Sequence, residues 1–287
     1  MIDNILVISS EHQPYRRAAQ IAACELGKYP IDRLKIIWAN HRHHHSENEL
    51  IEMIAEHGLE NYREVLNINT PEWDFRHYYL SIFEANVRTF RTCVDTNTYA
   101  IILQDDFLLK IPYEDIAEKI EQLLNVVGEQ VFLQLDYSYD SYQHEWENRD
   151  DSIRPVKGTL DFVHGCLGAS EHALYVTPQG AARMLHYLST TEHMESVESH
   201  LPRHLYNADW VYSALRPETF VHHASALQGD SIGVWHNKQN FLPNREPQGA
   251  EAKQMGIIEK YKLLPDTAIT EIRQHGQEDS DTDEVAE

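Results

Sequence analysis

The chain has 287 residues, of which 42% are hydrophobic, so it can bury the core of one large α/β domain or of two smaller ones. Lys and Arg number 24 against 46 Asp and Glu, and the formal net charge of -22 argues against nucleic acid or an anionic membrane surface as the main partner, because both need clustered positive charge. The three cysteines are widely spaced and odd in number, and no apolar run resembles a signal peptide or a transmembrane segment, so we expect a cytoplasmic protein.

The first half of the sequence predicts strands that alternate with helices, judged from the spacing of its apolar residues. In chain order we expect a strand at 5–8, a loop at 9–13, a helix at 14–26, a strand at 34–38, a helix that starts after Ser46, a helix at 75–94 and a strand at 99–103. Ser46 and Glu49 have the spacing of a capping box, in which each side chain bonds to the backbone of the other residue.

The second half continues the alternation. We expect a helix at 113–127, a strand at 131–135, a polar loop at 137–157, a strand at 173–176, a helix that begins at Thr177–Pro178, a helix from Asn207 to Leu215 and an extended segment at 219–222. Residues 276–287 carry six acids and no base. We therefore expect one domain over residues 1–270 and an acidic, disordered tail over 271–287.

Strands alternating with helices favour a mostly parallel sheet with helices on both faces, in which ligands bind at the carboxyl ends of the strands. Asp105 and Asp106 directly follow an apolar strand. Two adjacent carboxylates repel each other, and a hard cation such as Mg²⁺ or Mn²⁺ relieves that repulsion and bridges to phosphates. The pair therefore suits a metal–diphosphate, and the alternative is a plain turn, which Asp also favours.

The order and spacing of several stretches are informative: Ile5–Arg17, Leu80–Thr92, Tyr99–Asp106, Gly168–Ala181, Asn207–Asp209 and Val221–His222 with Ser231–Ile232. Together they resemble family 25 glycosyltransferases, which include lipopolysaccharide-type β-galactosyltransferases and collagen galactosyltransferase domains. The resemblance covers roughly residues 4 to 235. Three departures are visible: Gln104 replaces a Glu, Ile82 stands where His is common, and no proline precedes Ala208.

The resemblance implies a GT-A-type, Rossmann-like mixed sheet flanked by helices. It also implies an inverting reaction that transfers a sugar from a nucleotide sugar, which we expect to be a UDP-sugar, to a hydroxyl of a glycan or glycoconjugate. It implies Mn²⁺ or Mg²⁺ as cofactor, with Asp106, Asp105 and His222 as metal ligands. The catalytic base is expected to be Asp209, with Asp136 as second choice. Donor-binding residues are expected to be Ser9, Glu11, Arg17, Ser81, Asp105 and Ser231.

Each of these assignments has a structural alternative. Asp209 suits the start of a helix, Asp136 suits a solvated loop, and Arg17 suits a helix surface. His223 competes with His222, because alternation along a strand lets only one of them face the site. The aromatic residues of the 137–157 loop, which begins at Tyr137, could stack on a sugar acceptor.

Two other functions fit the same residues. A nucleotidyltransferase also uses acids at strand ends to hold metal ions. A non-catalytic protein that keeps the fold and binds a nucleotide or sugar would explain the change at Gln104. The sequence does not define the donor sugar, the acceptor or the oligomeric state.

Overall fold

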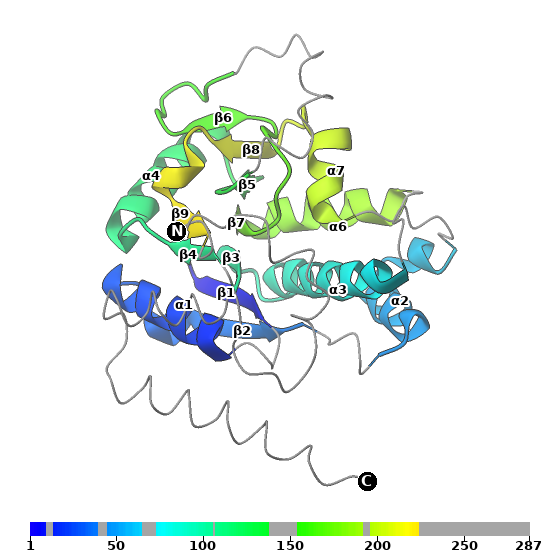
Figure 1. Ribbon diagram of the computed structural model, residues 1–287. Helices are drawn as coiled ribbons and strands as arrows, with labels where there is room; N and C mark the ends of the chain where they lie inside the picture. Colours follow the sequence, from blue (N-terminus) through cyan, green and yellow to red (C-terminus); the bar gives the residue numbers. More distant parts are fainter. Residues whose placement is uncertain are drawn as a thin grey trace, which may run out of the picture.

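The computed structural model describes residues 1–9, 14–39, 45–64, 73–105, 107–137, 154–191 and 196–223 (Figure 1). The strands are β1 (Asn4–Ser9), β2 (Leu34–Trp38), β3 (Ala100–Gln104), β4 (Phe107–Leu109), β5 (Phe132–Gln134), β6 (Phe162–His164), β7 (Ala173–Val176), β8 (Val211–Ala214) and β9 (Val221–His223). The helices are α1 (Pro14–Leu26), α2 (Glu47–Glu56), α3 (Trp73–Asp95), α4 (Tyr113–Val127), α6 (Pro178–Thr190) and α7 (Val197–His204). Short 3-10 turns lie at Ile31–Arg33, Glu60–Arg63 and Pro217–Thr219.

Seven strands form one mixed sheet in the order β2-β1-β3-β7-β5-β8-β6, and β4 pairs with β9 in a separate small sheet. This confirms the predicted α/β class with a mixed sheet flanked by helices. The expectation of a mostly parallel sheet needs correction, because the pairs β3–β7, β5–β7 and β6–β8 are antiparallel and only β1–β2, β1–β3 and β5–β8 are parallel. Strands β7 and β6 therefore run against the other five.

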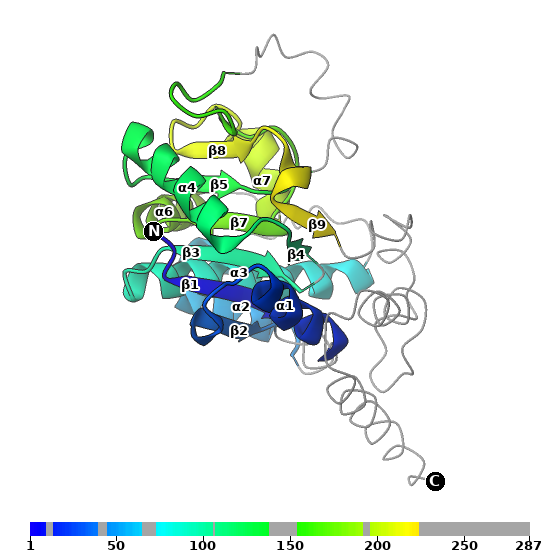
Figure 2. The same cartoon turned by 90° about the vertical axis from the view of Figure 1, so that its left-hand side faces the viewer.

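Helices cover both faces of the sheet, and Figures 1 and 2 show α1 and α4 on one side with α2, α3, α6 and α7 on the other. The alternation of side chains along each strand supplies both cores. In β1, Ile5 and Val7 pack with residues of α1 and α4, whereas Leu6 and Ile8 pack with residues of α2, α3 and α6. Strands of this kind are apolar throughout because neither face meets water.

Most helix starts and strand cores lie where the sequence predicts them. The capping box of α2 forms as expected, since Glu49 N donates to Ser46 Oγ at 3.3 Å and Ser46 N donates to the Glu49 carboxylate at 2.6 Å. Thr177 caps α6 by accepting from Gly180 N at 3.0 Å, with Pro178 in the first helical position. These local signals work because each satisfies backbone N–H groups that the first helical turn leaves without partners.

The predicted helix from Asn207 to Leu215 is wrong. Residues 211–214 form β8, which pairs in parallel with β5 and antiparallel with β6. The stretch Val211–Tyr212 is β-branched and aromatic, which suits a strand buried on both faces better than a helix. Strands β4 and β6 and helix α7 are further elements that the periodicity did not predict; the two strands have three residues each, too few to show a period.

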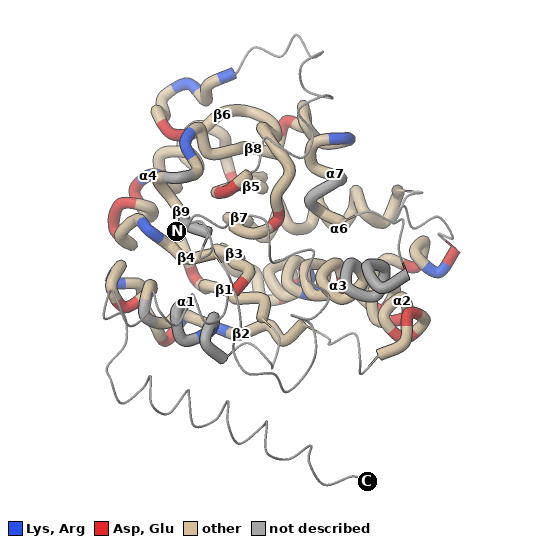
Figure 3. The backbone as a smooth tube through the Cα atoms, in the orientation of Figure 1, with Lys and Arg blue, Asp and Glu red and all other residues tan. Residues whose placement is uncertain are grey.

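Figure 3 shows Lys and Arg scattered singly over several elements in the described part of the chain. None of the helices there combines the length and the hydropathy needed to span a bilayer. The predicted polar loop lies mostly outside the described residues, as does the predicted acidic tail at 271–287.

Candidate functional site

The order β2-β1-β3 places a topological switch point between β1 and β3. From β1 the chain crosses to β2 through α1 on one face, and from β2 it returns past β1 to β3 through α2 and α3 on the other face. The carboxyl ends of β1 and β3 therefore lie where the chain direction across the sheet reverses. Ligands of open α/β sheets bind at such switch points. We call this end of the seven-stranded sheet, where β1, β2, β3, β5 and β8 finish, the carboxyl edge.

Asp105 lies at this switch point, directly after β3, with only 7% of its surface exposed. The Ser9 hydroxyl, at the end of β1, donates to Asp105 Oδ2 at 2.7 Å. The Asp105 N–H donates to the carbonyl of Ile8 at 3.1 Å, so β1 holds both the backbone and the carboxylate. Two residues predicted for the donor site are thus brought into direct contact.

Arg17 is the third predicted residue at this position. Its Nη1 donates to Ser9 Oγ at 3.4 Å, and its guanidinium carbon lies 4.8 Å from the centre of the Trp38 ring. Trp38 ends β2, so stacking on its face fixes the cation beside the switch point. The result is a carboxylate, a hydroxyl and a guanidinium arranged over the carboxyl ends of β1, β2 and β3.

The turn that carries Asp105 is held by Gln20 from α1. The Gln20 amide donates to the carbonyl of Gln104 at 3.1 Å and also to the carbonyl of Phe107. Gln20 is completely buried, and these contacts bracket the acidic pair on both sides. Gln20 therefore positions the turn, and as a lone polar residue within the alanine-rich stretch 18–23 it gave no sign of that role.

The other predicted metal ligands cannot be placed at the level of side chains. Asp106 lies outside the described residues, and for His222 the structure describes the backbone alone. Strand β9 pairs antiparallel with β4, so the backbone of His222 lies opposite Leu108 and that of His223 opposite Phe107. The fold thus brings the late histidine pair beside the segment that follows Asp106. Within the described residues, no group of three His, Cys, Asp or Glu side chains could hold a metal ion.

A second polar cluster occupies the carboxyl edge on the other side of β3. Asp136 follows β5, and Ser170 and His172 precede β7. Ser170 Oγ lies 3.5 Å from Asp136 Oδ2 and 3.1 Å from His172 Nδ1, and His172 Nδ1 lies 4.0 Å from Asp136 Oδ2. The cluster joins Asp136, the second choice for the base, to a histidine that the sequence did not suggest.

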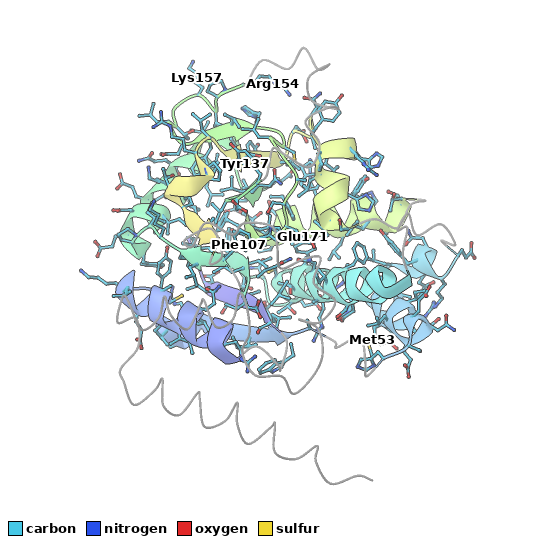
Figure 4. The ribbon with its side chains drawn as sticks, in the orientation of Figure 1. Met53, Phe107, Tyr137, Arg154, Lys157 and Glu171 are labelled. Carbon is cyan, nitrogen blue, oxygen red and sulfur yellow. The ribbon has the colours of Figure 1, made fainter. Side chains whose placement is uncertain are left out.

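The ring of His172 stacks on Phe107, with ring centres 4.5 Å apart and planes 10° apart. Phe107 begins β4, just past the acidic pair, so this stacking links the two clusters. Figure 4 shows Phe107 and Glu171 near the middle of the molecule, with Tyr137 close by. Tyr137 donates its hydroxyl to the carbonyl of Leu215 at 3.3 Å, which fixes the start of the predicted aromatic loop.

Asp209, the first choice for the base, is not brought to this edge. It precedes β8, and because β8 runs parallel to β5, residues that precede it lie at the opposite end of the sheet. Its side chain is 86% exposed and pairs with Arg183 Nη1 at 2.9 Å. Its surroundings are those of a surface ion pair.

The remaining predicted donor residues are only partly placed. Ser81 is buried in the N-terminal half of α3, which lies toward the carboxyl edge because α3 runs back from the end of β2 to the start of β3. Glu11 and Ser231 lie outside the described residues.

A scan against models of known protein families gave no match for this chain, and a search of curated proteins gave none either. Among solved structures, the chain is similar to mouse xyloside xylosyltransferase 1 in its apo form, with a TM-score of 0.35 and 14% identity over 66% of this chain and 71% of that one. A TM-score this low carries no argument about activity. The resemblance to family 25 glycosyltransferases stays a prediction from the sequence, and function has to be argued from the side chains at the carboxyl edge.

Proposed function

We propose that this chain is a metal-dependent, inverting glycosyltransferase that moves a sugar from a UDP-sugar to a hydroxyl of a glycan or glycoconjugate. One observation carries the proposal: the buried Asp105 carboxylate lies at the switch point of the sheet, bonded to Ser9 at 2.7 Å with Arg17 next to it. A carboxylate beside a cation at this place suits a ligand that carries both a metal ion and phosphates.

The proposed metal site is centred on Asp105. Among the described side chains Asp105 alone of the predicted ligands is available, and a complete set would also need Asp106 and His222. A divalent ion held there would neutralise charge on the departing diphosphate. A hard, oxygen-rich site of this kind fits Mg²⁺ or Mn²⁺ better than a thiol-preferring metal.

Residues of the chain itself would bind the phosphates and accept the proton. Arg17 offers a planar guanidinium, fixed on Trp38, to a phosphate oxygen. Helix α1 begins at this edge, and the partial positive charge of its first turn favours an anion. In this proposal the proton of the attacking hydroxyl leaves toward the other side of β3, where Asp136 lies with Ser170 and His172.

Thermal unfolding with UDP, GDP and CMP, each with and without Mn²⁺, tests the proposal. A ligand at a hundredfold excess over its Kd stabilises the native state by about 2.7 kcal/mol, which raises Tm by on the order of 5 °C for a chain of this size. We expect UDP with Mn²⁺ to raise Tm by this amount. The Asp105→Asn and Asp106→Ala variants should lose the part of the Tm rise that depends on the metal. The control is Asp95→Asn, an exposed acid at the end of α3 and at the opposite end of β3.

Absence of any metal-dependent nucleotide effect would contradict the proposal. If UDP binds, release of UDP from a panel of UDP-sugars separates a transferase from a protein that only binds the nucleotide. Release of UDP is expected for one sugar above the others.

A further inference from the structure

The hydrogen bonds around Ser170 bear on the protonation of His172. The Ser170 hydroxyl has one proton, and Asp136, as a carboxylate, can only accept. The arrangement that uses both contacts has the hydroxyl donating to Asp136 Oδ2, 3.5 Å away, and Nδ1 of His172 donating to Ser170 Oγ at 3.1 Å. The nearby Asp136 oxygen, 4.0 Å from Nδ1, favours the same tautomer. We thus assign the ring proton to Nδ1, which leaves a lone pair on Nε2, the form that accepts a proton.

This cluster is rigidly built. Ser170 is buried, its hydroxyl accepts from the His172 N–H at 3.1 Å, and its carbonyl accepts from the Gln134 amide at 3.0 Å. The Gln134 amide oxygen accepts in turn from Ser213 Oγ at 2.9 Å, so side chains of β5 and β8 hold the cluster in place. The Phe107 ring fixes the plane of the imidazole.

The position of His172 complements that of Asp105. The ladder between β3 and β7 continues one residue past the strands, since Gln104 N donates to the His172 carbonyl at 2.7 Å. His172 thus pairs with the residue just before Asp105. The Ser9–Asp105–Arg17 group lies toward β1 and the Asp136–Ser170–His172 group lies toward β5, so the two groups flank the end of β3.

We propose that His172 is the catalytic base of the transfer and that Asp136 is a positioning residue that acts through it. This inference rests on the proposed glycosyltransferase function. It makes His172, in place of Asp209 or Asp136, the group that contacts the acceptor hydroxyl. The hydroxyl oxygen forms a bond to the anomeric carbon while the bond from that carbon to the diphosphate breaks and UDP leaves with the bonding pair. The hydroxyl proton moves to Nε2, and the resulting imidazolium is stabilised by the Asp136 carboxylate.

The test compares His172→Ala, His172→Gln and Asp136→Asn with the wild-type chain. The control is His186→Gln, an exposed histidine on α6. The readout is UDP release from the UDP-sugar that the wild type cleaves fastest, with water as acceptor. We expect both His172 variants to lose roughly 10²–10⁴-fold in rate, as is typical for loss of a general base. Asp136→Asn should lose at least about tenfold, because the amide no longer favours the Nδ1–H tautomer or the imidazolium.

Azide separates a catalytic role from a structural one. Azide is a nucleophile with no proton to lose, so it needs no base, and it should restore UDP release in His172→Ala by at least about tenfold while changing the wild-type rate little. The UDP-dependent rise in Tm should stay unchanged in His172→Ala. A wild-type rate in His172→Ala, or a loss that azide does not reverse, would overturn the assignment of His172. A missing UDP effect in the wild-type chain itself overturns the proposed function instead, and with it this inference.

Discussion

At the scale of single residues, Asp105 shows how the site is held together. Asp105 is only 7% exposed, and a buried carboxylate is unstable unless hydrogen bonds or opposite charges replace the lost hydration. Ser9 supplies a short hydrogen bond, and Arg17 bonds to that same hydroxyl. These residues are therefore arranged around a charge before any ligand arrives, and Ser9 is the residue through which this arrangement can be tested.

Replacement of Ser9 by Ala should destabilise the chain by about 1.5–3 kcal/mol, because it removes a hydrogen bond to a buried charge. Urea unfolding followed by circular dichroism measures the loss. The same replacement in the Asp105→Asn background should cost distinctly less, since the acceptor there is neutral. An equal cost in both backgrounds would mean that the 2.7 Å contact contributes nothing specific to stability.

At the scale of elements, the contact between α6 and β5 explains the Gly-Ala pair in the sequence. Gly180 lies in the first turn of α6, where an added Cβ would lie 2.0 Å from the carbonyl oxygen of Val131. Thr177 ties the same two elements together by accepting from Val131 N at 3.1 Å. The glycine thus lets the start of the helix approach the backbone that enters β5, and β5 in turn carries Asp136 to the carboxyl edge.

Gly180→Ala should therefore destabilise the chain by about 1–3 kcal/mol or more through overpacking against backbone, although alanine is the better helix former. The comparison is Gln179→Ala, one residue earlier on the exposed side of the same turn, which should be within about 0.5 kcal/mol of wild type. Chemical denaturation of both variants measures the difference. A stabilising Gly180→Ala would show that α6 can move away from β5 without cost.

The direction of β7 also explains what the sequence could and could not predict about the site. The apolar run before Asp105 and the strand before Asp136 were recognisable, and parallel strands place both residues at the same edge. His172 precedes its strand, so in a parallel sheet it would lie at the far end; only the antiparallel β7 brings it to the carboxyl edge. Strand direction depends on pairing between distant segments, which local periodicity does not encode.

The same reasoning accounts for Asp209. A helix starting at Asn207 would have placed Asp209 in a first helical turn, whereas the strand β8 places it at the end of the sheet remote from Asp105. The residues that the sequence placed correctly are those whose position follows from one strand alone, as for Ser9 and Asp105. Those it misplaced depend on the topology of the whole sheet.

At the scale of the whole molecule, the sheet separates two apolar cores. The α1/α4 core contains Cys24 on α1, and the α3/α6 core contains Cys93 on α3. Both cores use side chains from the same strands, as Ile101 and Ile102 of β3 point to opposite faces. Neither layer can lose its helices without exposing one full face of the sheet, so the described part of the chain should unfold as one cooperative unit.

The reactivity of Cys24 and Cys93 measures whether the two cores unfold together. Burial raises the pKa of Cys24, and that of Cys93, to about 12, so at pH 8 both thiols stay protonated in the folded chain and react slowly with a thiol reagent. Unfolding returns each pKa to its ordinary value near 9, where about a tenth of each thiol is ionised at pH 8 and reacts quickly. The experiment applies short pulses of the thiol reagent at pH 8 over a series of urea concentrations and measures labelling of each cysteine peptide by mass spectrometry. We expect Cys24 and Cys93 to become reactive at the same urea midpoint, and this midpoint should match that of unfolding followed by circular dichroism. Labelling of Cys24 at clearly lower urea than Cys93 would show that α1, with Arg17 and Gln20, detaches from the sheet on its own, and that Asp105 can lose these neighbours without global unfolding.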